Sequence, residues 1–269
     1  MKEHLRHLVE QADEPLMGWA VAREYLQARL LEAVQDTGTF NDWAFVGGTA
    51  LRFLYSIPRF SEDLDFSLIR SGEEAGLETP LGEMKRVLSR EGYPIEVRVK
   101  EQRTVAAAWV RFPGLPFELG LSPRRAQILS IKIEVDTRPP SGAGLETSIV
   151  RRHVTLNLRH HDRPSLFAGK LHAVLNRKWA KGRDLFDLAW YLSEPIRPEP
   201  NLVLLNAALE QTGWSGPRLT ESSWRDEVRR RLQVIDWERA RADIRPFLER
   251  ERDLVLVTLE SLDRLLAVQ

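Results

Sequence analysis

The pattern of apolar and polar positions changes character about halfway along the chain. Apolar residues recur at helical spacing within residues 1–38, and segment 128–137 alternates, with Ile131 and Ile133 on one face. Further alternating runs predict strands, whereas from residue 165 onward the apolar positions return to the helical period. This order of elements predicts an α+β fold, in which a mixed sheet is followed by an all-helical C-terminal part.

A loop rich in proline and glycine, RPPSGAG at residues 138–144, separates these two parts. We therefore expect one domain over residues 1–145, with the sheet and the N-terminal helix, and a mainly helical domain over residues 146–269. The 269 residues, of which 43% are hydrophobic, are enough to form both cores.

Composition narrows the class of protein. The chain has no cysteine, which excludes disulfides, thiolate zinc sites and a cysteine nucleophile. The N-terminus carries no apolar stretch of the kind that a secretory signal needs, and no run approaches the roughly 20 apolar residues of a membrane span. We expect a cytoplasmic protein that does not insert into a membrane.

A possible phosphate site follows the short apolar run WAFV. Gly47 and Gly48 lie between this predicted strand and a predicted helix that starts with Thr49 at its N-cap. Backbone N–H groups at a helix N-terminus attract phosphate, and glycine lets the phosphate approach closely. The alternative is a tight strand-to-helix turn with no ligand.

A possible metal site follows a few residues later. Asp63 and Asp65 are two apart, so on a strand both carboxylates project from one face and can share Mg²⁺. A third carboxylate on a neighbouring strand could hold metal or accept a proton, and Glu134 is favoured over Asp136 for this role. A surface acidic turn is the alternative.

The helical half offers a lysine and two more acids. Lys170 lies at the edge of an apolar helical stripe and could reach a phosphate, although a lysine that extends along the helix to solvent is the alternative. Asp184 and Asp187 are three apart on the next predicted helix and share a face with Tyr191. The alternative is that Asp184 has a structural role only, because an aspartate near the start of a helix interacts favourably with the helix dipole.

Charge is balanced overall but not locally. The chain has 39 basic and 39 acidic residues, yet residues 151–183 hold nine Lys or Arg and one acid. We call residues 151–183 the basic window and expect it to bind RNA through phosphate contacts, unless it is a solvated helical face with no partner. The side chains chosen for RNA binding are Arg151, Arg152, Arg159, Arg177 and Lys178.

Taken together and in this order, five motifs resemble the AbiEii/AbiGii nucleotidyltransferase toxins, a family that includes the MenT toxins of mycobacteria. The motifs are GGTAL from Gly47, RFSEDLDF from Arg59, IKIE ending at Glu134, the Lys170 segment and RDLFDL from Arg183. The resemblance runs from about residue 40 to residue 193.

The resemblance implies a fold, an activity and a set of roles. It implies a DNA polymerase β-like nucleotidyltransferase core, a nucleoside triphosphate (NTP) as co-substrate and Mg²⁺ as cofactor. Asp63, Asp65, Lys170 and Asp184 would be catalytic, with Asp187 as the substitute for Asp184. Gly47, Gly48, Thr49, Arg59, Ser61 and Lys170 would bind the nucleotide.

The resemblance also implies a biological setting. Members are toxins of toxin–antitoxin or phage-defence systems that a separate antitoxin protein neutralises, and MenT members add nucleotides to the 3′ end of tRNA and stop translation. Three other functions fit the residues less well: nucleotide transfer to a small hydroxylated molecule such as an antibiotic, a non-catalytic binding module, and a metal-dependent nuclease. A small acceptor needs no basic window, and the intact acids, lysine and glycines argue against a module without activity.

Overall fold

The structure is a computed structural model, and it describes residues 2–12, 14–101, 104–195 and 198–267. The chain forms two compact units, which we call the sheet unit and the helical unit. The sheet unit comprises Met1–Ser56, Phe60–Pro139 and Glu146–His160, and the helical unit comprises Ile57–Arg59, Pro140–Leu145 and His161–Gln269. The units therefore alternate along the sequence, and the domain boundary expected between residues 145 and 146 stays a prediction.

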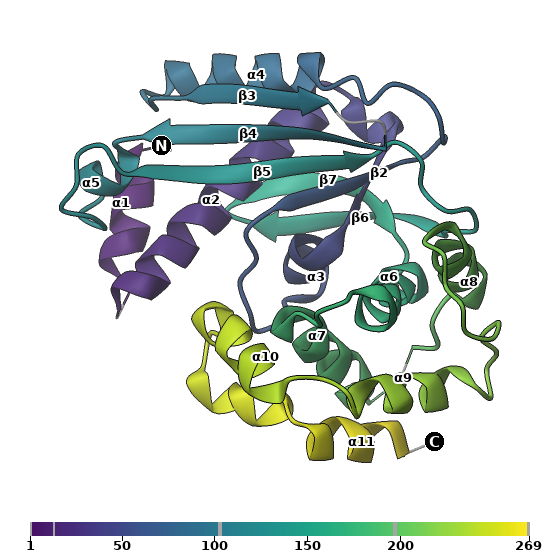
Figure 1. The fold of residues 1–269 in the computed structure, drawn as a ribbon. Coiled ribbons are helices and arrows are strands. Elements are labelled where there is room, and N and C mark those ends of the chain that lie inside the picture. Colours follow the sequence, from purple (N-terminus) through teal and green to yellow (C-terminus); the bar gives the residue numbers. More distant parts are fainter. Residues whose placement is uncertain (1, 13, 102–103, 196–197, 268–269) are drawn as a thin grey trace. The chain divides into compact units, whose positions relative to one another are not determined.

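Seven strands form one mixed sheet, which confirms the α+β fold (Figure 1). The spatial order is β3-β4-β5-β2-β1-β7-β6, with β2–β5 and β1–β7 parallel and β1–β2, β3–β4 and β4–β5 antiparallel. The strands are β1 (Trp43–Val46), β2 (Leu64–Leu68), β3 (Glu96–Glu101), β4 (Val105–Pro113), β5 (Ile128–Asp136), β6 (Leu145–Arg152) and β7 (Val154–His161).

The strands have this order because the most apolar runs occupy the centre. Phe45 of β1 and Phe66 of β2 pair across the strands, and their rings lie 5.4 Å apart between centroids. On β5, Ile131 and Ile133 are buried, as the alternation predicts. The edge strand β6 and its neighbour β7 were not anticipated from the sequence, since β6 has no buried position and β7 has only three.

Helices of the sheet unit pack on this sheet. Helix α2 contacts α4 and β5, α4 also contacts β3, and α3 contacts β1 and β2. The single helix expected over residues 1–38 is two helices, because Pro15 starts α2 and cannot continue α1. The helices are α1 (Lys2–Glu10), α2 (Pro15–Asp36), α3 (Gly47–Tyr55), α4 (Glu78–Arg90) and α5 (Leu115–Glu118), with a 3₁₀ turn η1 (Thr39–Asn41).

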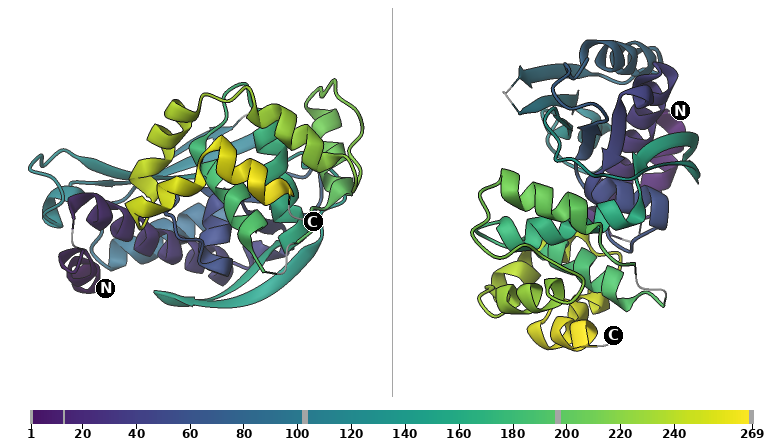
Figure 2. Two further views of the ribbon diagram at one scale, coloured as in Figure 1. Left: turned by 90° about the horizontal axis from the view of Figure 1, so that it is seen from below. Right: turned by 90° about the vertical axis from the view of Figure 1, so that its right-hand side faces the viewer.

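The helical unit gathers around α6 and α7 (Figure 2). Helix α6 contacts α7, α8 and α9, and α7 contacts α10 and α11. Gly182 at the start of α7 allows the close packing on α10, because a Cβ there would lie 1.9 Å from the carbonyl oxygen of Ala240. The elements are α6 (Arg163–Asn176), α7 (Gly182–Ser193), α8 (Leu202–Gln211), α9 (Trp224–Leu232), α10 (Trp237–Ile244), α11 (Leu259–Ala267), and the 3₁₀ turns η2 (Arg245–Phe247) and η3 (Glu251–Leu256).

Helix α7 is buried on more faces than its sequence pattern predicted. Leu185 and Leu188 are buried as expected, but Asp184, Asp187 and Tyr191 on the other face are buried as well. None of the helices in the described part of the chain has the length and apolar character needed to cross a membrane.

Candidate active site

Gly47 brings the backbone at the start of α3 against the carboxylate of Asp65. Strands β1 and β2 pair Val46 with Asp65, so Gly47 comes directly after this pair. Gly47 has a left-handed backbone with φ of +80°, and a Cβ there would lie 2.3 Å from Asp65 Oδ2. Any side chain would displace the carboxylate, so only glycine fits. The fold thus sets a carboxylate beside the N-terminus of a helix.

The hydroxyl of Thr49 has a different role from the one expected. Helix α3 begins at Gly47 with Val46 as its N-cap residue and without a capping side chain, so the N-cap role predicted for Thr49 is wrong. Thr49 is fully buried, and its hydroxyl donates to the carbonyl oxygen of Asp63. This bond fastens the first turn of α3 to the segment that leads into β2.

The acid on the neighbouring strand lies opposite Asp65. Parallel pairing of β2 with β5 sets Asp65 beside Glu134, and side chains at paired positions point to the same face. Glu134 Oε1 is 2.7 Å from Lys132 Nζ. The alternative, Asp136, pairs with Ser67 and accepts a hydrogen bond of 2.9 Å from the N–H of Arg138. Burial raises the pKa of Asp136 despite that bond.

The acid pair fits a hard cation that takes its remaining ligands from water and substrate. Mg²⁺ in proteins is commonly held by one or two carboxylates together with phosphate oxygens and waters. The absence of a side chain at Gly47 lets the Asp65 carboxylate lie against the backbone, where a Cβ would clash with it. Within the described ranges, no three His, Asp or Glu side chains gather closely enough to hold a metal by themselves. The metal roles of Asp63, Asp65 and Glu134 therefore stay predictions.

In the helical unit, Lys170 lies between the two aspartates of α7. Lys170 Nζ is 2.8 Å from Asp187 Oδ2 and 3.3 Å from Asp184 Oδ1. Arg177, which follows the last residue of α6, also pairs with Asp184. The lysine is thus held in place by α7 and does not extend freely into solvent.

Asp187 makes a second, stronger contact, with Arg59. Arg59 Nε and Nη2 each lie 2.6 Å from one Asp187 oxygen, and the exposed fraction of the Arg59 side chain is only 1%. Burial by itself would raise the pKa of Asp187, but the charges of Arg59 and Lys170 outweigh it and hold this pKa below its usual value. The three side chains form a buried charged network.

Sequence reasoning did not find the Arg59–Asp187 pair. The two residues are 128 positions apart, and a contact of that range leaves no periodic signal in one sequence.

Ser61, predicted to bind the nucleotide, lies in the sheet unit, where its carbonyl oxygen accepts a 3.1 Å hydrogen bond from Gln27.

The structure divides the basic window into cations that pair internally and cations that face solvent. Arg152 Nε lies 3.0 Å from Glu24 Oε1, and Arg177 pairs with Asp184. Arg151 and Lys178 are exposed, and Arg159 is half-buried. The first third of the window is strand rather than the helical face considered as the alternative.

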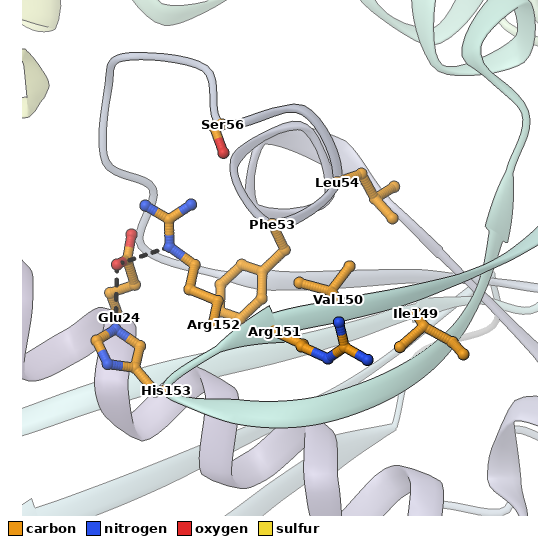
Figure 3. A pocket seen from close by; sticks show the side chains of 9 residues that line it. All are labelled: Glu24, Phe53, Leu54, Ser56, Ile149, Val150, Arg151, Arg152 and His153. Carbon is orange, nitrogen blue, oxygen red and sulfur yellow. Dashed lines mark hydrogen bonds and ion pairs between the residues drawn. The ribbon is translucent and has the colours of Figure 1, made fainter.

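A groove of about 630 Å³ runs between the end of α3 and the β6–β7 turn (Figure 3). Buried Glu24 forms its acidic end, where it pairs with Arg52, Arg152 and His153. Burial would raise the pKa of Glu24, but these partners, His153 foremost, lower it to about 2. Arg151 projects along the opposite part of the groove. The groove therefore carries two arginines of the basic window, Arg151 and Arg152, whereas the pairing of Arg152 with Glu24 was not indicated by the sequence.

The mixed seven-stranded sheet, with Gly47 set against Asp65, defines an α+β protein. Residues 29–268 match the family model described as nucleotidyl transferase AbiEii toxin, type IV toxin–antitoxin system. The chain belongs to this family. It is therefore a nucleotidyltransferase that uses a nucleoside triphosphate, and its family consists of toxins of type IV toxin–antitoxin systems.

Solved structures share the fold. A protein named JHP933 from Helicobacter pylori is 19% identical, with a TM-score of 0.56 over 92% of this chain and 90% of that one. A second H. pylori protein, described as a nucleotidyltransferase, is 17% identical, with a TM-score of 0.53 over 92% and 96%. MenT4, a nucleotidyltransferase toxin of Mycobacterium tuberculosis, is 19% identical, with a TM-score of 0.50 over 97% and 99%. No curated protein matches the sequence.

Proposed function

We propose that this protein is a cytoplasmic, Mg²⁺-dependent toxin that transfers nucleotides from an NTP to RNA, with the 3′ end of tRNA as acceptor, and so blocks translation. The close approach of the Gly47 backbone to the Asp65 carboxylate carries the proposal, because it joins a place for phosphate to a place for a cation. The basic window supports a polyanionic acceptor over a small one.

The side chains of the sheet unit would bind the metal and the triphosphate. Asp63 and Asp65 are the metal ligands, and bound Mg²⁺ would neutralise triphosphate charge. Gly47 and Gly48 offer backbone N–H groups to the phosphates, whereas Thr49 contributes through its backbone because its hydroxyl is taken by Asp63. Ser61 lines the nucleotide site.

The helical unit would supply the positive charge. Lys170 contacts a phosphate and is positioned by Asp184 and Asp187. Since the Arg59 guanidinium is buried against Asp187, we assign Arg59 a positioning role, in which it holds Asp187 for Lys170. Only Phe60, Ser61 and Glu62 separate Arg59 from Asp63 in the chain.

In the reaction, the 3′-hydroxyl oxygen of the acceptor attacks the α-phosphorus of the NTP. The bond from that phosphorus to the oxygen bridging to the β-phosphate breaks, and pyrophosphate leaves with the electron pair. The hydroxyl proton passes to a carboxylate, for which Glu134 on β5 is our candidate. Backbone N–H groups of the glycine turn and Lys170 stabilise the charge on the phosphates.

The test is incubation of the protein with each α-labelled NTP, total RNA and Mg²⁺, with an Asp63→Asn variant as the inactive control. We expect label on RNA of tRNA size, and no label on RNA whose 3′ end was first oxidised with periodate. Label on a small molecule, shortened RNA, or no change in any fraction would each refute transfer to RNA.

Removal of Lys170 tests its phosphate role. We expect Lys170→Ala to raise the KM for NTP or lower kcat by at least about tenfold, because a positioned cation stabilises triphosphate charge. Lys181→Ala, an exposed lysine beside α7, is the matched control. Unchanged nucleotide kinetics in a folded Lys170→Ala protein would reduce Lys170 to a structural residue.

A further inference from the structure

The loop between α6 and α7 presents a tryptophan to solvent. Trp179 is 57% exposed, the highest value for a Trp or Phe side chain in the described part of the chain. Trp179 therefore offers a large aromatic surface to a partner. The loop joins the helix that carries Lys170 to the helix that carries Asp184.

Positive side chains surround this ring. The Arg239 guanidinium carbon lies 5.0 Å and the Lys178 Nζ lies 5.6 Å from the ring centroid of Trp179. Both cations are exposed. Asp236, an acid that lines the same cavity as Trp179, accepts a 3.0 Å hydrogen bond from the N–H of Arg239 at the start of α10. The surroundings therefore combine an aromatic face with an excess of positive charge.

The loop that carries Trp179 is held in place. Arg231 of α9 donates to the carbonyl oxygens of Val174, Arg177 and Lys178 at 3.2, 2.6 and 3.3 Å. Arg177 also pairs with Asp184. Because these bonds fix the backbone on one side of the ring, a ligand that stacks on Trp179 need not order the loop first.

The cavity beside the ring is small. It measures about 70 Å³ and includes exposed Val234 and half-buried Ile235. Such a volume cannot enclose a whole metabolite, whose pockets run to roughly 300–1,000 Å³. The ring therefore lies at the open surface, where a flat group can stack on the part that the two cations over the ring leave exposed.

We propose that Trp179 is a stacking platform for an unpaired nucleobase, with Lys178 and Arg239 contacting the adjoining phosphates, and that the base belongs to the 3′ end of the acceptor RNA. Aromatic stacking with positive flanks is how proteins hold single-stranded nucleic acid without reading its sequence. The proposal rests on the proposed function, since it names a binding element for the same acceptor.

The test measures binding apart from catalysis. Fluorescence anisotropy compares a labelled RNA hairpin with an unpaired 3′ end and the same hairpin with a blunt end. We expect wild-type protein to prefer the unpaired end, Trp179→Ala to lose about tenfold in affinity for it and bind both alike, and Trp179→Phe to retain most of the preference. Phe117→Ala is the matched control, because Phe117 is 37% exposed and the Arg125 guanidinium lies 4.9 Å from its centroid.

Two further measurements separate the interpretations. Stacking releases no counterions, so Trp179→Ala should leave the slope of log affinity against log salt unchanged, whereas Lys178→Gln should reduce it by about one. A higher KM for NTP with unchanged RNA binding in Trp179→Ala would support stacking but assign the base to the donor nucleotide.

The result that overturns the proposal is an undiminished preference for the unpaired end in Trp179→Ala, with unchanged NTP kinetics. Failure of the wild-type protein to label RNA would refute the proposed function instead, and the anisotropy comparison would still report on stacking.

Discussion

Two pairs of aspartates lie in different surroundings, although the members of each pair are only two or three residues apart in the sequence. Asp63 and Asp65 are half-buried where a glycine backbone meets the start of a helix. Asp184 and Asp187 are buried, and Lys170, Arg59 and Arg177 pair with them. The comparison teaches that spacing alone does not predict what the fold places beside an acid. A glycine backbone lies against Asp65, whereas cations lie against Asp184 and Asp187.

The largest expected effect is on catalysis, in the first pair. We expect Asp63→Asn and Asp65→Asn each to lower nucleotide transfer by about 1,000-fold or more, because a metal ion contributes several kcal/mol to transition-state stabilisation. Steady-state labelling of RNA measures the loss, and thermal unfolding should change little. Glu74→Gln, which changes an exposed acid between β2 and α4, is the control. Near-normal turnover in a folded Asp63→Asn protein would break the comparison.

The second pair should respond mainly in stability. We expect Asp187→Asn to lower the free energy of unfolding by about 3–5 kcal/mol, because Arg59 would be left as a buried, uncompensated charge. Asp184→Asn should cost less stability, since its partner Arg177 is 43% exposed and can return to water. Urea denaturation measures both.

A double variant sharpens that result. Arg59→Gln combined with Asp187→Asn should destabilise less than the sum of the two single changes, because no unpaired charge remains at the buried pair. Additive losses would show that the Arg59–Asp187 pair does not couple.

Acid should weaken the sheet unit through Glu24. Its pKa is lowered to about 2 from an ordinary value of 4.5, which corresponds to about 3 kcal/mol of stability at neutral pH. A lowered pKa means that this contribution is present above pH 4.5 and is lost as the pH falls toward 2. We expect Glu24→Gln to be less stable than wild type at pH 7 and to approach it near pH 2. Parallel stability curves across this window would contradict the assignment.

The smallest expected effect concerns the acceptor. Arg151→Glu together with Lys178→Glu should reduce RNA labelling by about tenfold at physiological salt and leave NTP binding unchanged, because phosphate contacts contribute through counterion release. Arg152 and Arg177 are poor choices for this test, since their reversal would break the pairs with Glu24 and Asp184. Arg252→Glu, an exposed arginine outside the window, is the control. If the double variant labels RNA as well as the wild type does, the basic window is a solvated surface that does not bind RNA.

Local patterns were enough to predict much of the fold. Alternation over β5 and helical spacing over α6 and α7 are properties of neighbouring residues, and burial followed them at Ile131, Ile133 and Leu171. Strands β6 and β7 were missed because an edge strand with polar, exposed positions resembles a loop in composition. Thr49 was misplaced because helix α3 starts two residues earlier, at a glycine with a left-handed backbone.

The sequence by itself determined which chemical groups are available: the glycine turn, Asp63 and Asp65 two positions apart, and Lys170 ahead of Asp184 and Asp187. Each of these motifs is a property of nearby residues, so it can be recognised in the chain without the fold. Only the tertiary structure decided that Asp187 belongs to Arg59, that Arg152 belongs to Glu24, and that Trp179 remains exposed among cations. Pairs 128 residues apart form because folding removes charges from water and matches each buried charge with an opposite one, a selection that no local pattern records.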